Sequence, residues 1–452
     1  MSTPSRRLLP LGGEVSRAGE PGRAPGADDV MGAKAARLGQ ARAAGLPVLP
    51  GWVVPVAEAI PALDAGAAAV RAGRPAAARR AVLGRPLDDG LAGELREAVI
   101  RLGGRVIVRS SSPLESDGRW SGAFSSVTEV GPDDVGTAVR SCWASAFAVD
   151  PLERLALCGL PLEALRLGIL LQPEIRMTAG GVARVTASGT GGHVTVESVP
   201  GHPGALLSGW ADGASARVPL SFSPAGAPSL LDTTSPVPAE GALPNLVARS
   251  TVVAVARLAA RTYRELGDDT IEWAACDGET WLLQSQRSAS PRAASPRSAR
   301  DDAANVARGE PAPLPAVAAG LTGDGSRRWM PLLAAVVLAQ GQHVPARPAV
   351  PGTAAGRLVA CRPHERPPGD CRDAILLVDR PLPSLAPLLF AARGVMARAG
   401  AAGSHLAEVA RSLGVPMVIG CHPEPVMGQR LAGGDWIAAI DGSTGEAALL
   451  AG

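Results

Sequence analysis

Apolar residues follow two different spacings along the chain, which predicts a mixture of helices and strands. Residues 31–45 carry alanine and leucine at helical spacing and end at Gly45 ahead of two prolines, the usual stop signal of a helix. Residues 246–266 form a second amphipathic helical stretch. Short apolar runs at 106–108, 167–175, 180–188 and 193–198 predict strands, and a hairpin is expected around Asp277-Gly278.

The pattern changes twice in the second half of the chain. Residues from Ser288 to about Arg328 are rich in serine, proline, alanine and charge without a sustained period, which is typical of a linker. Residues 345–452 alternate short apolar strands with helical segments and predict a compact α/β domain. The expected fold class is therefore α+β, with a domain over 1–288, a flexible linker over 289–340 and a terminal domain over 341–452.

Composition and charge argue against several classes of protein. The 452 residues carry a net charge of only +2 and the arginines are spread out, which disfavours nucleic acid and anionic membranes as partners. The six cysteines include no C-x-x-C pair, which argues against a zinc site and a disulfide framework. No signal-peptide core begins the sequence, and the apolar run at 329–339 is too short to span a bilayer. A soluble cytoplasmic protein is expected.

Lys34 is the only lysine, and every other residue with a permanent positive charge is arginine. A lysine that survives such a bias indicates a position where a compact charge on a flexible stem is needed, as at a phosphate oxygen. Chance retention is the alternative. A second cation, Arg109, ends an apolar strand and opens a serine-rich turn, an arrangement that suits phosphate oxygens.

Residues 400–420, GAAGSHLAEVARSLGVPMVIG, contain the most specific pattern in the sequence. Ser404 is a favourable N-cap, and Gly414 with Pro416 ends the predicted helix. His405 then lies in the first turn, where its imidazole can act as a nucleophile and a phosphate on it would meet free backbone N–H groups. The alternative is a surface histidine near a helix cap.

This segment resembles the phosphohistidine motif of the swivelling domain in pyruvate phosphate dikinase, phosphoenolpyruvate synthase and rifampicin phosphotransferase. The matching positions are Gly400, Ser404, His405, Ala407, Ala410, Arg411, Leu413, Gly414, Pro416, Val418 and Gly420. Three positions depart from the family pattern: Ala401 replaces its second glycine, Ala397 its threonine and Glu408 an apolar residue. The resemblance implies that His405 is the residue that carries phosphoryl.

The first domain resembles the ATP-grasp-like nucleotide-binding unit of the same family. The resemblance rests on MGAKAARLG, GLPVLPGW, VRSSSPLES, LLQPEI and IEWA, and it covers roughly 25–290 and 340–450. It implies that Glu272 and Gln284 hold Mg²⁺. The implied nucleotide-binding residues are Lys34, Arg109, Gln172, Glu197, Glu272, Gln284 and Arg287.

Two departures affect this implied site. Thr270 stands where the family has a metal-binding aspartate, although Asp269 is adjacent, and Gln286 stands where it has arginine, with Arg287 displaced by one position. A register shift could restore both groups, or metal binding could be weaker.

The resemblance implies a dikinase-type phosphotransferase that uses ATP and Mg²⁺, phosphorylates His405, releases AMP and passes the phosphoryl group on. No stretch of the sequence fits the pyruvate-binding barrel of the dikinases. The expected acceptor is a small-molecule hydroxyl or a 2-oxo acid. Two alternatives remain: a phosphocarrier subunit that acts with a partner bearing the acceptor site, and a relative that binds ATP without turnover.

Overall fold

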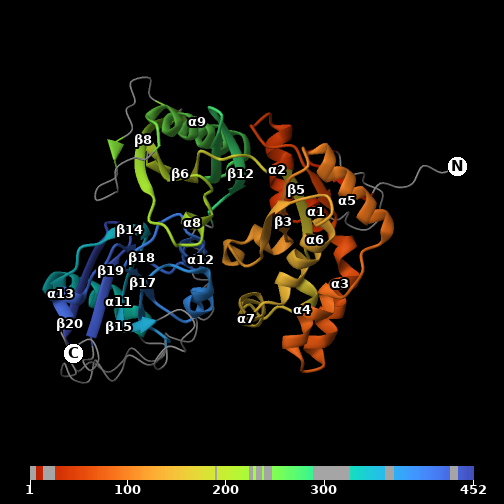
Figure 1. Ribbon diagram of the computed structural model, residues 1–452. Coiled ribbons are helices and arrows are strands. Elements are labelled where there is room, and N and C mark those ends of the chain that lie inside the picture. Colours follow the sequence, from red (N-terminus) through yellow and green to blue (C-terminus); the bar gives the residue numbers. More distant parts are fainter. Residues whose placement is uncertain are drawn as a thin grey trace. The chain divides into compact units, whose positions relative to one another are not determined.

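A computed structural model describes residues 7–13, 26–188, 191–222, 228–230, 237–238, 247–288, 326–361, 371–427 and 436–451 (Figure 1). The chain divides into two compact units. The first comprises residues 1–288 with 380–390 and 403–409, and the second comprises 289–379, 391–402 and 410–452. Helices and strands alternate in both, so the expected α+β class is confirmed.

The first unit begins with a five-stranded sheet in the order β1-β2-β5-β3-β4. Helices α3 to α6 pack beside it, and their apolar faces share one core with the strands (Figure 1). The strands are β1 (Leu9–Pro10), β2 (Trp52–Val54), β3 (Val106–Ser111), β4 (Ser126–Val130) and β5 (Gly168–Pro173). The helices are α1 (Ala27–Met31), α2 (Ala33–Ala43), α3 (Val56–Arg71), α4 (Pro75–Leu83), α5 (Asp89–Arg101), α6 (Val135–Ala144) and α7 (Val149–Leu157).

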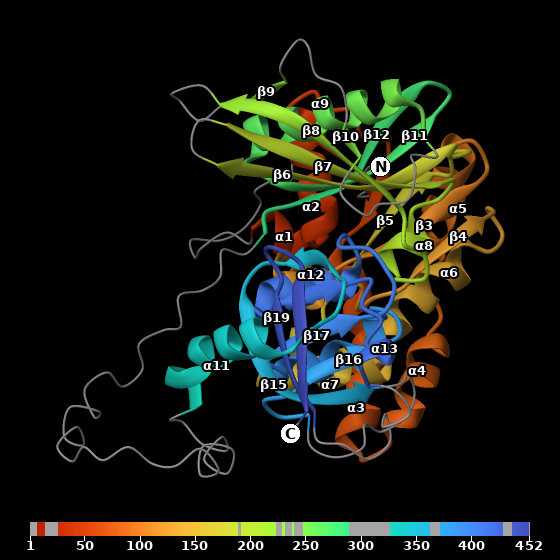
Figure 2. The same ribbon diagram turned by 90° about the vertical axis from the view of Figure 1, so that its left-hand side faces the viewer.

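A second, antiparallel sheet follows in the same unit, with the path β10-β8-β7-β6-β11-β12 and β9 beside β8. Helix α9 lies along this sheet, because its buried stripe from Val252 to Ala260 packs on the strands (Figure 2). The strands are β6 (Ala179–Ser188), β7 (Gly191–Pro200), β8 (Ala214–Phe222), β9 (Pro228–Leu230), β10 (Val237–Pro238), β11 (Thr270–Cys276) and β12 (Glu279–Gln286). The helices are α8 (Gly204–Leu207) and α9 (Arg249–Leu266).

The expected hairpin joins β11 to β12. Asp277 and Gly278 both have positive φ, at 51° and 84°, as a two-residue primed turn requires. The register places Glu272 directly opposite Gln284. This pairing sets two of the predicted site residues side by side.

The second unit contains an eight-stranded sheet in the order β13-β20-β19-β15-β16-β17-β18-β14. Its strands are β13 (Gln342–His343), β14 (Arg347–Val350), β15 (Thr353–Cys361), β16 (Ile375–Val378), β17 (Gly394–Ala397), β18 (Met417–Ile419), β19 (Trp436–Asp441) and β20 (Glu446–Ala451). Its helices include α11 (Ser326–Gln340) and α13 (Glu424–Met427), and α12 (His405–Leu413) crosses the boundary between the units. The parallel strands β16, β17 and β18 are apolar along their whole length and buried at every position, as in a sheet that is covered on both faces.

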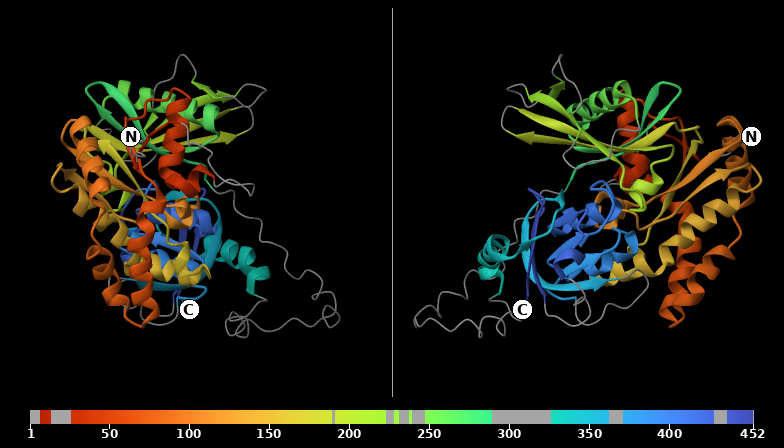
Figure 3. Two further views of the ribbon diagram at one scale, coloured as in Figure 1. Left: turned by 90° about the vertical axis from the view of Figure 1, so that its right-hand side faces the viewer. Right: turned by 60° about the vertical axis from the view of Figure 1, so that its left-hand side comes forward.

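The linker prediction is wrong for residues 326–340. Residues 326–340 form helix α11, and Ala334 and Val337 are buried against β15, β19 and β20 (Figure 3). An apolar stripe that can pack on a sheet orders this segment, which the serine- and proline-rich composition before it had obscured. Residues 289–325 of the predicted linker lie outside the described residues.

The helix predicted over residues 31–45 is observed as α2 over Ala33–Ala43, and Gly32 separates it from α1. Gly32 has a φ of 78°, and a Cβ atom there would lie 1.9 Å from the backbone oxygen of Ser111.

In the part of the chain that the structure describes, none of the helices has both the length and the apolar character needed to cross a bilayer.

Candidate active site

The start of α2 is fixed against the serine-rich turn that follows β3. The N–H of Ala33 donates to the carbonyl of Ser112 at 3.1 Å, and the N–H of Ala35 donates to Ser111 Oγ at 3.0 Å. These bonds satisfy donors that a helix start leaves without partners in its own helix. They also bring Lys34 to the end of β3, 76 residues away in sequence.

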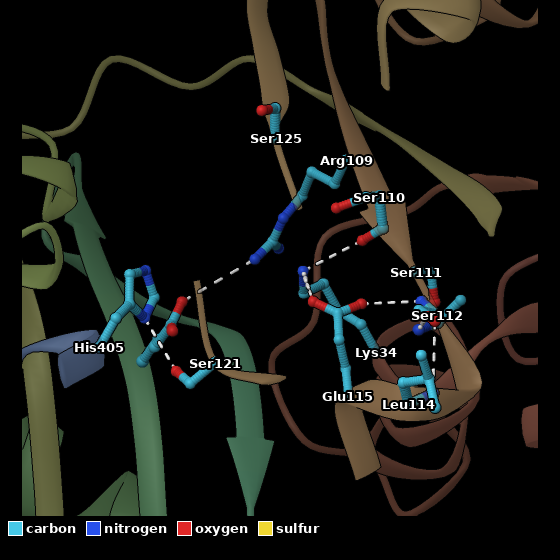
Figure 4. A network of polar contacts seen from close by, with 12 residues as sticks. Lys34, Arg109, Ser110, Ser111, Ser112, Leu114, Glu115, Ser121, Ser125 and His405 are labelled. Carbon is cyan, nitrogen blue, oxygen red and sulfur yellow. Dashed lines mark hydrogen bonds and ion pairs between the residues drawn. The ribbon is translucent and has the colours of Figure 1, made fainter. Parts of the chain in front are cut away.

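Lys34 points into a narrow polar niche beside this turn (Figure 4). Its Nζ donates to the carbonyl of Ser110 and to Glu115 Oε1, each at 3.0 Å. The side chains of Lys34 and Glu115 are only 9% and 10% exposed. The niche accepts a compact ammonium between two oxygens, which is the geometric reason for a lysine rather than an arginine here.

Arg109 extends from β3 toward the second sheet and is almost fully buried. Its guanidinium donates to the carbonyl of Leu283 at 2.7 Å and to Gln172 Oε1 at 3.2 Å, and it lies 3.9 Å from Glu272 Oε2. Burial lowers the pKa of Arg109, while the carboxylates of Glu272 and Glu115 oppose that shift. The two sheets of the first unit are thus joined by a cation at the predicted phosphate site.

A cavity of about 450 Å³ collects most of the predicted residues. Its polar wall includes Lys34, Arg109, Gln172, Glu272 and Gln284. A different part of the wall is apolar, with Leu49, Ile107, Ile175, Met177 and Leu283. A cavity of this size with one cationic and one apolar part suits a ligand that carries both phosphates and a flat ring.

Two predicted residues, Glu197 and Arg287, are absent from the wall of this cavity, and a third, Gln172, lies on it but is bonded to neighbouring groups. Gln172 lines the cavity, but its amide is engaged with Arg109 and with the carbonyl of Leu49. Glu197 is buried on β7 and is not part of the cavity wall. Arg287 donates to the carbonyl of Gly267 and faces a second hollow of about 210 Å³, which Lys34 also borders.

The structure shows how the two departures at β11 and β12 are accommodated. Asp269 Oδ1 accepts hydrogen bonds from Thr270 Oγ1 and from the N–H and Oγ of Ser288, each at 2.9 Å. This carboxylate is therefore committed to the strand end and does not substitute for the family's aspartate. Gln286 borders both hollows while Arg287 borders only the smaller. Among the described residues no group of three or more histidine, cysteine, aspartate or glutamate side chains could hold a metal.

His405 begins α12, as predicted, and Ser404 caps this helix through its Oγ, which accepts from the N–H of Ala407 at 3.3 Å. Residues 403–409 belong to the first compact unit, and in that unit His405 Nδ1 lies 3.0 Å from Ser121 Oγ (Figure 4). His405 also lines the larger cavity. Burial of the ring lowers the pKa of His405 below its ordinary value of 6.5, which favours the neutral, nucleophilic form.

Sequence reasoning missed Glu115 and Ser121 as members of this site. Glu115 lies in the same VRSSSPLES segment as Arg109, and its spacing of three residues from Ser112 is the signature of a capping box. That signal predicts a turn and says nothing of Lys34. Ser121 is one of many serines in the segment, and nothing in the local sequence distinguishes it.

Comparison with known proteins gives two family models and one relative that match this chain. Residues 28–219 match the family model of the pyruvate phosphate dikinase AMP/ATP-binding domain, and residues 371–445 match that of the mobile domain of PEP-utilising enzymes. The chain is also 29% identical over 291 residues to the prodigiosin synthesizing transferase PigC of Serratia marcescens. That alignment covers 57% of this chain and 31% of the relative, so the chain spans about a third of the length of that protein.

Proposed function

Because the chain belongs to the family of pyruvate phosphate dikinase, phosphoenolpyruvate synthase and rifampicin phosphotransferase, we propose that it transfers phosphoryl from ATP to His405 and on to an acceptor. The observation that carries the proposal is the convergence of Lys34, Arg109, Glu272 and Gln284 on the wall of one cavity, which His405 also lines. Two cations and an acidic group are the components that phosphoryl transfer from a nucleotide requires.

The proposed step follows dikinase chemistry. A nitrogen of His405 attacks the β-phosphorus of ATP, and the bond from that phosphorus to the oxygen shared with the α-phosphorus breaks, so that AMP leaves and the β- and γ-phosphoryl groups stay on the histidine. Water then removes the terminal phosphoryl group as inorganic phosphate. In the tautomer with the proton on Nδ1, Nδ1 donates to Ser121 Oγ, and Nε2 carries the lone pair that attacks. Lys34 and Arg109 hold the phosphate chain, and their charges offset the negative charge of the transition state.

Glu272 and Gln284 fit a magnesium ion that also binds the nucleotide. Both side chains face the cavity from paired positions on β11 and β12 and supply one carboxylate and one carboxamide oxygen. Mg²⁺ commonly uses only one or two protein carboxylates and completes its shell with phosphates and water. When bound, the ion would neutralise phosphate charge and orient the β- and γ-phosphoryl groups.

The acceptor that the proposal favours is a small molecule. The similarity to a prodigiosin synthesizing transferase supports a small-molecule acceptor over a partner protein. A hydroxyl or a 2-oxo acid is consistent with the chemistry of N-phosphohistidine, which is a good phosphoryl donor. Copurification of a second polypeptide that is required for transfer would instead support a phosphocarrier subunit.

Incubation with Mg-ATP is expected to add one phosphoryl group to the protein and to release AMP. The His405→Ala variant should show neither, whereas His343→Ala, which changes an exposed histidine of β13, should behave like the natural protein. Intact-protein mass spectrometry under alkaline conditions detects the adduct, and chromatography measures AMP. Bound ATP without an adduct would overturn the proposal and favour a relative that binds ATP without turnover.

The rate of His405 phosphorylation is expected to hold its neutral-pH value as the pH falls below 6.5. The reason is that burial depresses the pKa of His405, so the imidazole remains unprotonated until the pH falls through that lowered value. Single-turnover measurements with saturating Mg-ATP from about pH 5.5 to 8 provide the profile. A midpoint at or above 6.5 would contradict the expected desolvation.

A further inference from the structure

The ion pair between Lys34 and Glu115 lies on the cavity wall, and the proposed chemistry gives Glu115 no role. The two residues are 81 positions apart in sequence, and their charged atoms lie 3.0 Å apart with both side chains largely withdrawn from water. Exposed ion pairs contribute little to the free energy of folding. A buried pair persists only where further hydrogen bonds compensate the cost of removing its charges from water. Both partners here have such bonds.

Glu115 is itself immobilised by the turn that carries it. Its Oε2 accepts from the N–H of Ser112 at 2.7 Å, while its Oε1 faces Lys34. Ser112 Oγ in turn accepts from the N–H of Leu114 and donates to the carbonyl of Arg166. The carboxylate is therefore held on both oxygens and forms a rigid part of the β3 turn (Figure 4).

The hydrogen bonds of Lys34 show how the rigid carboxylate of Glu115 orients the ammonium group. An ammonium has three donors. One is directed to the Ser110 carbonyl and one to Glu115, and among the described residues no partner is seen for the third. Lys34 borders both hollows of the site, so the third N–H is the one that can meet a phosphate oxygen. A free lysine chain would have to lose much rotamer freedom to reach the same position.

We propose that Glu115 is a positioning residue for Lys34: its carboxylate, fixed by Ser112, orders the ammonium before ATP arrives and directs the remaining N–H at a phosphate. This inference rests on the proposed function, because it takes Lys34 to be a phosphate ligand. It assigns a role to Glu115 that acts through Lys34 and requires no contact of Glu115 with the nucleotide.

The single lysine allows a direct test. Full-length protein grown with lysine labelled by ¹⁵N at Nζ should give one side-chain ammonium signal, which is visible only when hydrogen bonds protect its protons from exchange. We expect the signal in the natural protein without ligand and its loss in Glu115→Gln. A signal that persists unchanged in Glu115→Gln, or one absent from the natural protein, would overturn the inference.

A double-mutant cycle separates positioning from a purely structural role. Glu115→Gln should slow His405 phosphorylation by about tenfold to a hundredfold, as expected when a catalytic contact is misplaced by about 1 Å. In a Lys34→Met background the same change should cause no further loss. Losses that multiply in the double variant would show that Glu115 acts independently of Lys34 and would overturn the proposal.

Two further variants control for damage to the turn. Ser112→Ala removes the hydroxyl that accepts from the N–H of Leu114 but keeps the backbone N–H that donates to Glu115. The ammonium signal should therefore remain in place. Glu97→Gln breaks an exposed ion pair with Arg101 on α5 and should change neither readout. Should Glu115→Gln fail to fold, Glu115→Asp, whose shorter chain cannot span both partners, replaces it with the same expected loss.

Failure of the inference and failure of the proposed function give different results. If Mg-ATP shifts the ammonium signal but Glu115→Gln changes neither the signal nor the rate, the nucleotide site stands and the inference fails. If ATP neither binds nor shifts the signal of the natural protein, the proposed function fails, and with it the phosphate contact that the inference assigns to Lys34.

Discussion

Replacing Lys34 by arginine is expected to slow phosphorylation of His405 about 100-fold, although the positive charge is retained. The ammonium fits between the carbonyl of Ser110 and Glu115 Oε1, each 3.0 Å away, in a niche where both charged side chains are about 90% buried. A planar guanidinium is longer and broader, so it must displace the turn or leave the niche. Quenched-flow measurement of phosphohistidine with Mg-ATP gives the rate.

The matched control is the opposite exchange at an exposed position. Arg257→Lys on α9 changes the same pair of residue types where the side chain faces solvent, and it should leave the rate unaltered. Should Lys34→Arg keep the natural rate, the geometric account of the lone lysine would be wrong and chance retention would be the better explanation.

The second large effect is expected at Glu272. Glu272→Gln should reduce His405 phosphorylation roughly a hundredfold, because Glu272, opposite Gln284, is the carboxylate that we propose to hold Mg²⁺. The affinity for ATP should change much less, since the proposed phosphate ligands Lys34 and Arg109 are unchanged. Rates measured over a range of Mg²⁺ concentrations, together with calorimetric titration of ATP, separate the two effects.

Glu279→Gln is the control, because Glu279 is exposed on the same hairpin and does not line the cavity. A hundredfold loss in both variants would indicate damage to the hairpin and contradict a role for Glu272 in metal binding.

Thr270→Asp extends the test of metal binding to a neighbouring position on β11. Thr270 and Glu272 lie two residues apart on one face of β11 and line a common hollow, so a carboxylate there should lower the Mg²⁺ requirement roughly tenfold.

Local sequence determined the features that depend on short-range interactions. Ser404, the apolar stripe after it and Gly414 predict α12 and its cap, because both depend on hydrogen bonds and contacts within about four residues. The Asp277-Gly278 turn was predictable for the same reason. The motifs around Lys34, Arg109 and His405 also indicated the family whose models match residues 28–219 and 371–445.

Tertiary structure decided the contacts between segments that are far apart in sequence. Lys34 meets Glu115 because Gly32 lets α2 begin against the β3 turn, and Arg109 reaches Leu283 because the two sheets pack together. No local periodicity encodes such pairings, which depend on how whole elements dock. Docking likewise turned Arg287 toward the smaller hollow and ordered α11 within the predicted linker. The sequence therefore determined which groups are available for the chemistry, and packing decided which of them meet, because each contact requires two elements to be placed within a few tenths of an ångström.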